Sequence, residues 1–339
     1  MPRSHFVIDL ACVRHNVRVL LRALGGAELW AVVKADGYGH GAVDAARAAL
    51  AEGATALCVA TVGEAAALRL ALPEARTIVL GPTSEADIPA ARTLGIELVV
   101  SEGPLPEGIP LHLKLDTGMG RWGFSELPRA SADVVGVMSH LASADEDTAF
   151  TELQARRFLE ATASLSHLTR HLANSAAALR HPSTRLDAAR CGIALYGISP
   201  FGRDPAGDGI RPVLRWESEV AQVRKLAPGE STGYGRRFVA GRPLWVGLVP
   251  VGYADGLRRD LTGTEVLVEG ERRRIVGTVS MDAVAVELPS PVPSGARVTL
   301  LGDGVTIEQH AALAGTIGYE LACGLVTRPP RATREVVDG

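Results

Sequence analysis

Residues 28–41 read ELWAVVKADGYGHG, an apolar run of strand length that ends at Lys34 and passes into a glycine-rich turn. A lysine rarely closes a buried strand unless its charge is paired, because the ammonium group loses its hydration there. Burial would lower the pKa of the amine towards neutrality, and a neutral amine can form a Schiff base with a carbonyl group. For this residue alone, the alternative is a structural lysine that extends its amine into solvent.

Further runs of the same kind follow this first one and alternate with alanine-rich, helix-forming segments. The strand candidates lie at 28–33, 55–60, 76–81, 96–100, 110–115, 133–139, 169–173 and 186–190, and the helix candidates at 41–51, 62–72, 85–94 and 146–168. This alternation predicts βαβ units with parallel strands, and eight units are typical of a TIM barrel, whose active sites lie at the carboxyl ends of the strands. A doubly wound sheet is the alternative, but no GxGxxG motif follows the first strand.

The pattern changes after residue 213. Strand candidates then follow one another, broken by Gly, Pro and Asp turns, at 244–251, 266–268, 274–279, 284–288 and 297–301. Only 307–314 is predicted to be helical in this part of the chain. We therefore expect an α/β protein with a (β/α)8 barrel over residues 1–213 and a mostly-β domain over residues 214–339, joined by the linker 202–209.

The composition excludes several classes of protein. The chain has 339 residues, 47% of them hydrophobic and 22% charged, with a formal net charge of −3, which indicates a globular protein without a nucleic-acid partner. No apolar run approaches the roughly eighteen residues of a membrane span, and charges interrupt the N-terminal segment, so we expect a cytoplasmic protein with no membrane partner. The four cysteines lie far apart without a CxxC pair, which predicts buried, reduced thiols and no metal site.

The phrase AVVKADGYGHG at 31–41 resembles the cofactor-lysine signature of alanine racemases, and further matches occur in the same order along the chain. They are LKLDTGMGRWG (113–123), SHLASADE (139–146), HLANSAAAL (171–179), ARCGIALYG (189–197), GYG (233–235), VGYADG (251–256), VSMD (279–282) and GYE (318–320). The sequence thus resembles the alanine racemase family over nearly its whole length. The resemblance implies a barrel that carries pyridoxal 5′-phosphate and is followed by a β domain, in agreement with the strand pattern.

The resemblance implies that the protein interconverts L-alanine and D-alanine by a two-base mechanism. A proton must leave one face of the substrate and return to the other, so an acid–base group is needed on each side. By resemblance, Lys34 holds the cofactor and serves one face, while Tyr234 serves the other. A free tyrosine titrates near about 10, so hydrogen-bonding or cationic neighbours must lower the pKa of Tyr234, and His140 is its implied partner.

Arg190 ends the last strand candidate of the barrel and is implied to face the ring nitrogen of the cofactor. An arginine keeps its proton, so the ring nitrogen stays unprotonated and withdraws electrons less strongly. That suppresses side reactions at the cofactor and suits a racemase. For this residue alone, the alternative is an arginine in a salt bridge at a strand end.

The other residues implied by the resemblance bind the cofactor or substrate, or lie at the entrance. The implied cofactor-binding residues are Lys34, Tyr38, His140, Asn174, Ser175, Arg190, Gly192, Ile193 and Tyr319. Arg121 and the backbone N–H of Met281 are expected to bind the substrate carboxylate. The supporting or entrance residues are Lys114, Asp145, Tyr253 and Asp282, and Lys114 matches a position where the family often carries a carbamylated lysine.

Lys34 and Arg190 belong to the predicted barrel, whereas Tyr234 and Met281 belong to the predicted β domain. In the family the β domain of one subunit completes the barrel site of the other, so we expect a homodimer with two shared sites. A broad-specificity or lysine/serine racemase on the same scaffold is one alternative, because it would keep both bases. A decarboxylase of the related ornithine type would place an acidic residue where Arg190 stands, and a non-catalytic cofactor carrier would lack the β domain.

Overall fold

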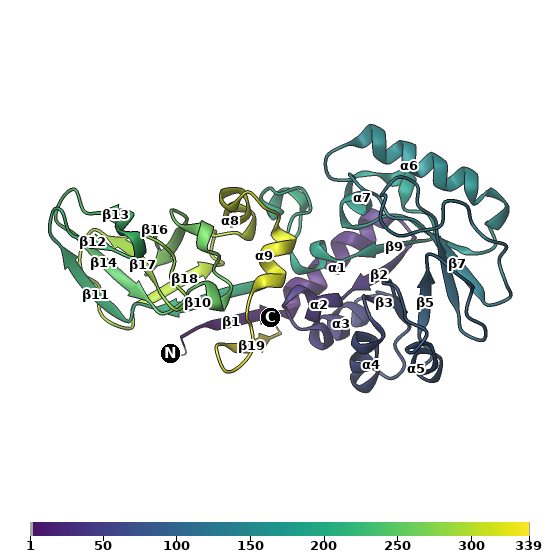
Figure 1. Cartoon of the computed structure of the whole chain (residues 1–339), viewed down its shortest axis with the longest axis horizontal. Helices are drawn as coiled ribbons and strands as arrows, with labels where there is room; N and C mark the ends of the chain where they lie inside the picture. The colour runs from purple at the N-terminus through teal and green to yellow at the C-terminus, as the bar shows by residue number, and fades with distance from the viewer. Residues whose placement is uncertain (1–2, 339) are drawn as a thin grey trace. The chain divides into compact units, whose positions relative to one another are not determined.

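Eight parallel strands, β2 to β9, close into a barrel in one of the two units of the computed structural model (Figure 1), which describes residues 3–338. This barrel unit comprises residues 12–201 and 206–211. Its strands are β2 (Glu28–Val32), β3 (Ala56–Val59), β4 (Thr77–Val79), β5 (Glu97–Val100), β6 (Leu111–Lys114), β7 (Val134–Met138), β8 (Thr169–His171) and β9 (Ala188–Cys191). Each overlaps one of the strand candidates, so the predicted barrel is confirmed.

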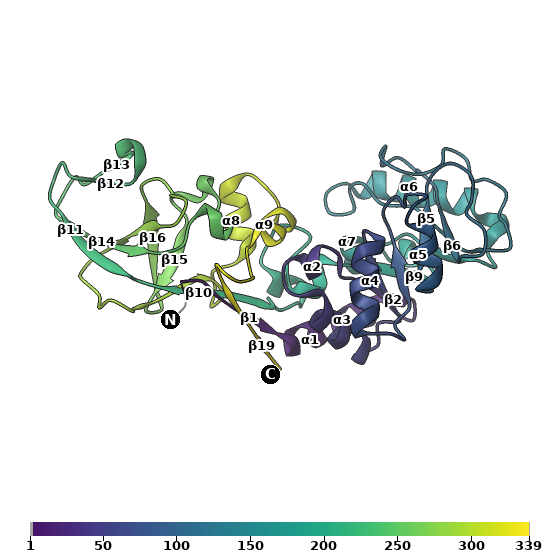
Figure 2. The same cartoon turned by 60° about the horizontal axis from the view of Figure 1, so that its bottom comes forward.

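Helices alternate with most of these strands. They are α1 (Leu10–Leu24), α2 (Lys34–Tyr38), α3 (Ala42–Ala51), α4 (Val62–Ala71), α5 (Ile88–Thr93), α6 (Thr148–Ala161) and α7 (Ser175–Arg180). Figures 1 and 2 show α3 and α4 outside the barrel, where α3 packs on β2 and α4 on β3 and β4. The helix expected at 146–168 is shorter: Asp147 caps its start by accepting from the Phe150 N–H at 2.9 Å, and after Ala161 the chain turns into a 3-10 helix, Ala163–Leu165.

Both faces of the barrel strands exclude water. Every residue of β3, β4, β6 and β9 is buried. Helices cover the outer face of a TIM barrel and side chains fill its interior, so the strands read as continuous apolar runs rather than alternating ones. Buried polar side chains on these strands, such as His112, Lys114 and Arg190, therefore need partners inside the barrel.

The β unit comprises residues 3–11, 202–205 and 212–338 and is built on a nine-stranded sheet in the described part of the chain. In sheet order its strands are β11 (Gln222–Leu226), β14 (Leu244–Val249), β17 (Val284–Leu288), β16 (Glu271–Val276), β15 (Glu265–Val268), β18 (Arg297–Leu301), β10 (Leu214–Glu219), β1 (His5–Asp9) and β19 (Thr333–Val337). A small separate pair is formed by β12 (Ser231–Thr232) and β13 (Phe238–Val239). The predicted mostly-β domain is confirmed.

The β unit includes the N-terminal strand and a second helix, which the sequence pattern did not predict. Strand β1 pairs with β10 and β19, so residues 3–11 lie in the β unit, although the sequence pattern placed them within the barrel range 1–213. This pairing joins residues from opposite ends of the chain, which no local pattern reveals. Besides α8 (Ile307–Ala314), the unit also contains α9 (Gly318–Gly324), whose terminal glycines weaken the helical pattern.

The cysteines only partly match the expected burial. Cys58 and Cys191 are fully buried, and burial raises the pKa of each thiol to about 12. Cys12 is half-buried and Cys323 is exposed, so the expectation that all four are buried is wrong. No disulfide joins any of these four residues, all of which the structure describes.

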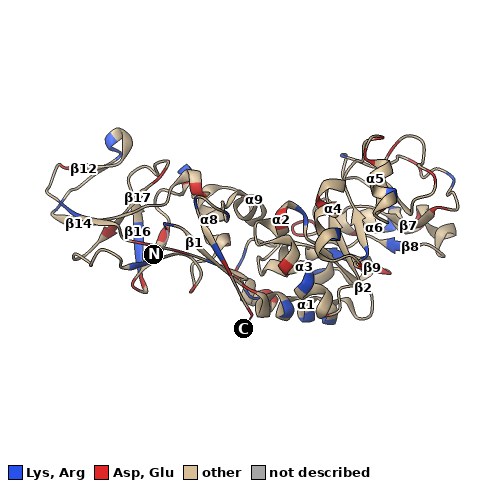
Figure 3. Ribbon diagram, turned by 90° about the horizontal axis from the view of Figure 1, so that it is seen from below, with Lys and Arg blue, Asp and Glu red and all other residues tan. Residues whose placement is uncertain are grey.

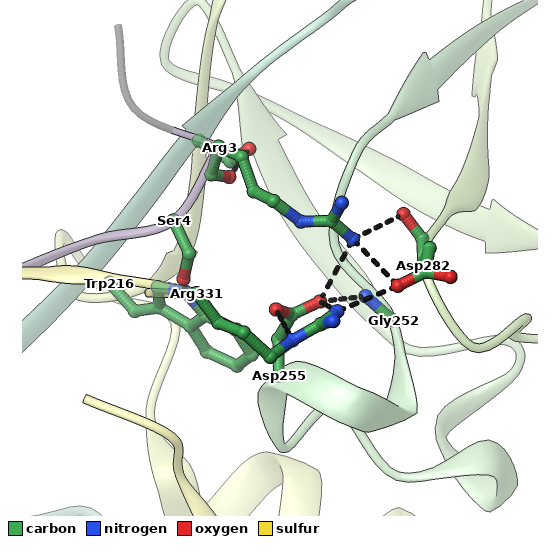
Figure 4. A network of polar contacts seen from close by, with 8 residues as sticks. Arg3, Ser4, Trp216, Gly252, Asp255, Asp282 and Arg331 are labelled. Atoms are coloured by element: carbon green, nitrogen blue, oxygen red, sulfur yellow. Dashed lines mark hydrogen bonds and ion pairs between the residues drawn. The ribbon is translucent and has the colours of Figure 1, made fainter. Parts of the chain in front are cut away.

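Acidic and basic residues are interspersed over each unit (Figure 3), but Asp255 differs because its side chain is fully buried, at 0% exposure. Its carboxylate accepts hydrogen bonds from the Arg331 guanidinium at 2.8 and 3.1 Å and from the Gly252 N–H at 2.9 Å (Figure 4). Arg331 also donates to Asp282 at 2.7 Å, and Arg3 donates to the Asp282 carbonyl at 2.9 Å. This network ties together four segments of the β unit, which carry Arg3, Asp255, Asp282 and Arg331.

The same network fixes two loops that carry candidate site residues. The Tyr253 N–H donates to the Ser280 carbonyl at 3.0 Å, and the Ala254 N–H donates to the Met281 carbonyl at 3.1 Å. Asp255 thus holds one loop directly through the Gly252 N–H, and the other through Arg331 and Asp282.

Replacing Asp255 with alanine should lower the free energy of unfolding by about 2–3 kcal/mol, because Arg331 and the Gly252 N–H would lose their buried anionic acceptor. Glu265→Ala is the control: its ion pair with Arg272 has side chains 54% and 45% exposed, and its loss should change stability by less than about 1 kcal/mol. Chemical denaturation of the full chain measures both. Equal stabilities for the two variants would contradict a structural role for Asp255.

Candidate active site

Lys34 immediately follows the first barrel strand, at the start of a segment whose backbone is unusual. Although labelled α2, this segment holds Ala35, Asp36 and Tyr38 at φ values of 52°, 51° and 53°, a left-handed conformation that residues with a side chain rarely adopt. The Glu64 carboxylate accepts from the Ala35 N–H at 2.7 Å and so helps to hold the turn. Strained backbone of this kind is concentrated at functional sites.

Tyr38, Ser175 and Gly192 come together beside this turn. The Ser175 hydroxyl accepts hydrogen bonds from the backbone N–H groups of Gly192 at 3.0 Å and Ala194 at 3.4 Å. A Cβ atom on Gly192 would lie 2.5 Å from the Tyr38 hydroxyl, so the tyrosine reaches this point only because residue 192 is glycine. Asn174 caps α7, with its side chain accepting from the Ala177 N–H at 3.0 Å. The hydroxyls and N–H groups predicted to hold a phosphate therefore do gather, next to buried Ile193.

Arg190 is buried on β9 and donates only to neutral acceptors. Its NH1 group bonds to the His171 carbonyl at 2.7 Å and to His171 Nδ1 at 2.9 Å, and its NH2 group bonds to the Ser139 carbonyl at 2.8 Å. No carboxylate within residues 3–338 forms an ion pair with it, so the salt-bridge interpretation is wrong. Burial lowers the pKa of Arg190 to about 10, which still leaves it cationic at neutral pH.

His140 follows β7 and contacts the same guanidinium. Arg190 NH2 lies 3.4 Å from His140 Nδ1. Burial, together with the charges of Arg190 and Lys114, holds the pKa of His140 well below its usual range. Because a guanidinium only donates, Nδ1 must accept, and the single proton of the neutral ring lies on Nε2.

Arg121 and Lys114 lie on either end of a loop that leaves β6. Asp116 accepts hydrogen bonds from the N–H groups of Gly118, Met119 and Gly120 at 2.8–3.2 Å, which folds the loop back on itself. The Arg121 guanidinium and the Lys114 amine lie 5.2 and 5.5 Å from the centre of the Trp122 ring. Burial and the neighbouring positive charge of Arg121 lower the pKa of Lys114 to about 8.

The remaining candidates belong to the β unit or to an exposed loop. Tyr234, Tyr253 and Met281 are 71%, 43% and 51% exposed, unusually high for large apolar or aromatic side chains. Asp282 joins the Asp255 network, and Tyr319 is half-buried on α9. Asp145 lies exposed before α6, and no contact brings it to the other candidates within the described residues. Within the barrel unit the structure brings most of the candidates into contact but leaves Asp145 apart, and within the β unit it leaves Tyr234, Tyr253 and Met281 exposed.

Comparisons with known proteins agree with this geometry. The family model described as the alanine racemase N-terminal domain matches residues 8–200, and that of the C-terminal domain matches residues 213–333. The chain belongs to the alanine racemase family. The alanine racemase of Lactiplantibacillus plantarum is 40% identical to it, over 97% of this chain and 96% of that protein.

Solved structures of other alanine racemases resemble this one over their full length. The alanine racemase from E. faecalis has a TM-score of 0.91 and 37% identity, covering 99% of this chain and 98% of that one. The biosynthetic alanine racemase from Pseudomonas aeruginosa has a TM-score of 0.92 and 35% identity, covering 99% and 100%. None of the helices described for residues 3–338 combines the length and apolar character that crossing a bilayer requires.

Several residues of this alanine racemase family member that contact the site were missed from sequence. Glu64 holds the Lys34 turn, Asp116 folds the Arg121 loop and His171 bonds to Arg190. Asp116 lies within a quoted motif and could have been found there, because an aspartate followed by Thr and Gly favours a side-chain-capped turn. His171 is the first residue of the quoted motif 171–179, but only the pairing of the barrel strands shows that it meets Arg190. Glu64 lies on α4, outside every quoted motif, and gives no local signal.

The Lys114 amine should react with carbon dioxide to form a carbamate, because only an unprotonated amine reacts and a pKa of about 8 leaves much of it unprotonated near that pH. The product is anionic and would remove the repulsion with Arg121. Isotope-labelled bicarbonate and carbon NMR measure the adduct, with Lys114→Arg as the blank. The signal should grow as the pH rises through 8; an identical signal from the blank would contradict the assignment to Lys114.

Proposed function

We propose that this protein interconverts L-alanine and D-alanine, with pyridoxal 5′-phosphate attached to Lys34. Membership of the alanine racemase family, an isomerase family, supports the reaction. The observation that carries the site assignment is the closure of the barrel. Strand β2, which leads into Lys34, pairs with β9, which carries Arg190 and leads into Gly192.

Arg190 supplies a donor that suits the ring nitrogen of the cofactor. Its two terminal nitrogens bond to protein atoms, whereas its Nε–H donates to no atom of residues 3–338. An unprotonated ring nitrogen accepts such an N–H, and the guanidinium keeps its proton at neutral pH. The Nε–H of Arg190 therefore fits the ring nitrogen of the cofactor.

The other end of the cofactor would be held by groups that suit a phosphate. The hydroxyls of Tyr38 and Ser175 and the backbone N–H groups at Gly192 and Ile193 lie together at the carboxyl ends of the barrel strands, where TIM barrels often bind phosphate. Tyr319, from the β unit, is proposed to join them. When bound, the cofactor makes the α-proton of an attached amino acid acidic.

Lys34 Nζ and the Tyr234 hydroxyl are proposed to move protons at the α-carbon from opposite faces. His140, neutral and protonated on Nε2, offers a hydrogen bond that would orient the tyrosine hydroxyl. Arg121 and the Met281 N–H are proposed to bind the substrate carboxylate, and Lys114 to orient Arg121. We assign the entrance, which would favour a small substrate, to Asp145, Tyr253 and Tyr319, with Asp282 in a supporting role.

Borohydride reduction of the purified protein should fix the cofactor to the peptide that contains Lys34. The sequence has only two other lysines, Lys114 and Lys225, which serve as internal controls. The reduced protein should lose the ability to racemise L-alanine, measured by chiral chromatography, and a panel of other L-amino acids would reveal broader specificity. Labelling at either control lysine, or no D-alanine from the untreated protein, would refute the proposal.

We further propose that the active enzyme is a homodimer in which the β unit of one subunit completes the barrel site of the other. The exposed side chains of Tyr234, Tyr253 and Met281 support this, because a partner surface would cover them. Each of two equivalent sites would then draw Lys34 from one chain and Tyr234 from the other.

Mixing inactive Lys34→Ala subunits with inactive Tyr234→Ala subunits should restore activity. Random exchange makes heterodimers about half of the population, and each heterodimer holds one site with both lesions and one with neither. Activity should therefore approach about a quarter of the wild-type value. If exchange is verified by mass spectrometry and activity stays at zero, both residues come from one chain and the shared site is ruled out.

A further inference from the structure

The buried charge of Arg190 is connected to a carboxylate through two histidines. Arg190 NH1 lies 2.9 Å from His171 Nδ1, and His171 Nε2 lies 2.9 Å from His112 Nδ1. His112 Nε2 lies 2.7 Å from the carboxylate of Glu97. Four strands of the barrel, β9, β8, β6 and β5, thus contribute one residue each to a continuous chain of hydrogen bonds.

The order of protons along this chain follows from its two ends. A guanidinium only donates, so His171 Nδ1 accepts and the proton of a neutral ring must lie on Nε2. His171 then donates to His112 Nδ1, whose own proton lies on Nε2 and is donated to Glu97. Burial lowers the pKa of both histidines, which agrees with neutral rings, and the bonds to His112 and Arg76 lower the pKa of Glu97 to about 2. Every bond therefore points from Arg190 towards Glu97.

A glycine on β7 leaves room for the contact between His112 and His171. Strand β7 lies between β6 and β8, yet the two histidines meet across it because residue 136 is glycine. A Cβ atom on Gly136 would lie 2.2 Å from His112 Nδ1. The fully buried Trp30 packs against both rings, with centroid distances of 5.6 Å to His112 and 4.5 Å to His171.

Glu97 is itself held from the opposite side. Arg76 donates to both of its carboxylate oxygens, at 2.7 and 3.0 Å, and the Glu97 side chain is 14% exposed. Glu97 is the first residue of β5, so it lies at the amino ends of the strands, whereas the candidate site lies at their carboxyl ends. The chain of hydrogen bonds therefore runs through the barrel from one rim towards the other.

We propose that Glu97, acting through His112 and His171, is a positioning residue that holds Arg190 as a donor to the ring nitrogen of the cofactor. This proposal rests on the function proposed above. The Glu97 carboxylate fixes the tautomers of His112 and His171, so that His171 Nδ1 remains an acceptor for Arg190. It also supplies a negative charge that the buried guanidinium lacks in its immediate surroundings, without placing a carboxylate against the cofactor.

Glu97→Gln removes this directionality. In the carboxylate, Oε1 accepts from Arg76 Nε at 2.7 Å, and Oε2 accepts from both Arg76 NH2 at 3.0 Å and His112 Nε2 at 2.7 Å. An amide has only one accepting oxygen, and we expect it to keep the bond from Arg76 Nε, which turns the amide NH2 group towards His112. The proton order then reverses, and His171 presents an N–H to the N–H of Arg190. Glu28→Gln is the matched control: Glu28 lies 3.7 Å from Arg76 and accepts from the Trp30 indole at 2.7 Å, but it contacts neither histidine in the described structure.

Nitrogen NMR of the cofactor-free protein reads the ring tautomers directly. The wild type and Glu28→Gln should show His171 and His112 protonated on Nε2, and Glu97→Gln should shift His171 towards Nδ1 protonation. On reconstitution, Glu97→Gln should bind pyridoxal phosphate about tenfold more weakly, the effect of one lost buried hydrogen bond. It should also lower kcat with little change in KM for alanine, while Glu97→Asp recovers most of both.

Two results would overturn the proposal. One is a wild-type protein in which His171 carries its proton on Nδ1. The other is a Glu97→Gln protein with wild-type tautomers and wild-type cofactor affinity, which would reduce Glu97 to a partner of Arg76. The tautomers are read without cofactor, so they test the hydrogen-bond chain even if labelling at Lys34 were to fail and refute the function itself.

Discussion

Strands β2 and β9 are the first and last strands of the barrel, and their parallel pairing places Trp30 opposite Arg190. This closure brings two residues that are 156 positions apart in the numbering, Lys34 and Arg190, to the carboxyl ends of neighbouring strands. Barrel closure also positions three other features: the turn at Lys34, the hydroxyls around Gly192 and the buried histidines. A barrel that failed to close would leave each of these groups on an exposed sheet edge.

The candidate site of the barrel unit concentrates positive charge with few carboxylates nearby. Burial and the charges of Arg190, Lys114 and Arg121 lower the pKa of His140, and burial also lowers the pKa values of Lys114 and Arg190. Such an environment attracts anions, which suits a phosphate and a substrate carboxylate. The hydrogen-bond partners of Arg190 are carbonyl groups and neutral imidazoles. Its positive charge is therefore not cancelled by an adjacent carboxylate.

In the β unit the candidate residues lie on loops rather than at the ends of barrel strands. A loop needs contacts with the rest of the protein to hold a side chain in place. The buried Asp255 and its arginine partners supply that support for the loops of Tyr253 and Met281 (Figure 4). The segment that carries Arg3 is anchored in turn, since the Ser218 hydroxyl donates to the Arg3 carbonyl at 2.7 Å and the Trp216 indole donates to Ser4 at 2.7 Å.

The sequence by itself determined the barrel strands, the β domain and the motif residues, because continuous apolar runs, glycine turns and the Lys34 phrase are local signals. The resemblance to the alanine racemase family also implied that Tyr38, Ser175 and Gly192 bind the cofactor together, and the structure brings these three residues into contact. Only the tertiary structure decided that residues 3–11 join the β sheet and that Glu97 reaches Arg190 through two histidines. These contacts join strands that are distant along the chain, and their existence depends on barrel register and on the space above Gly136, neither of which a local pattern of residue types encodes.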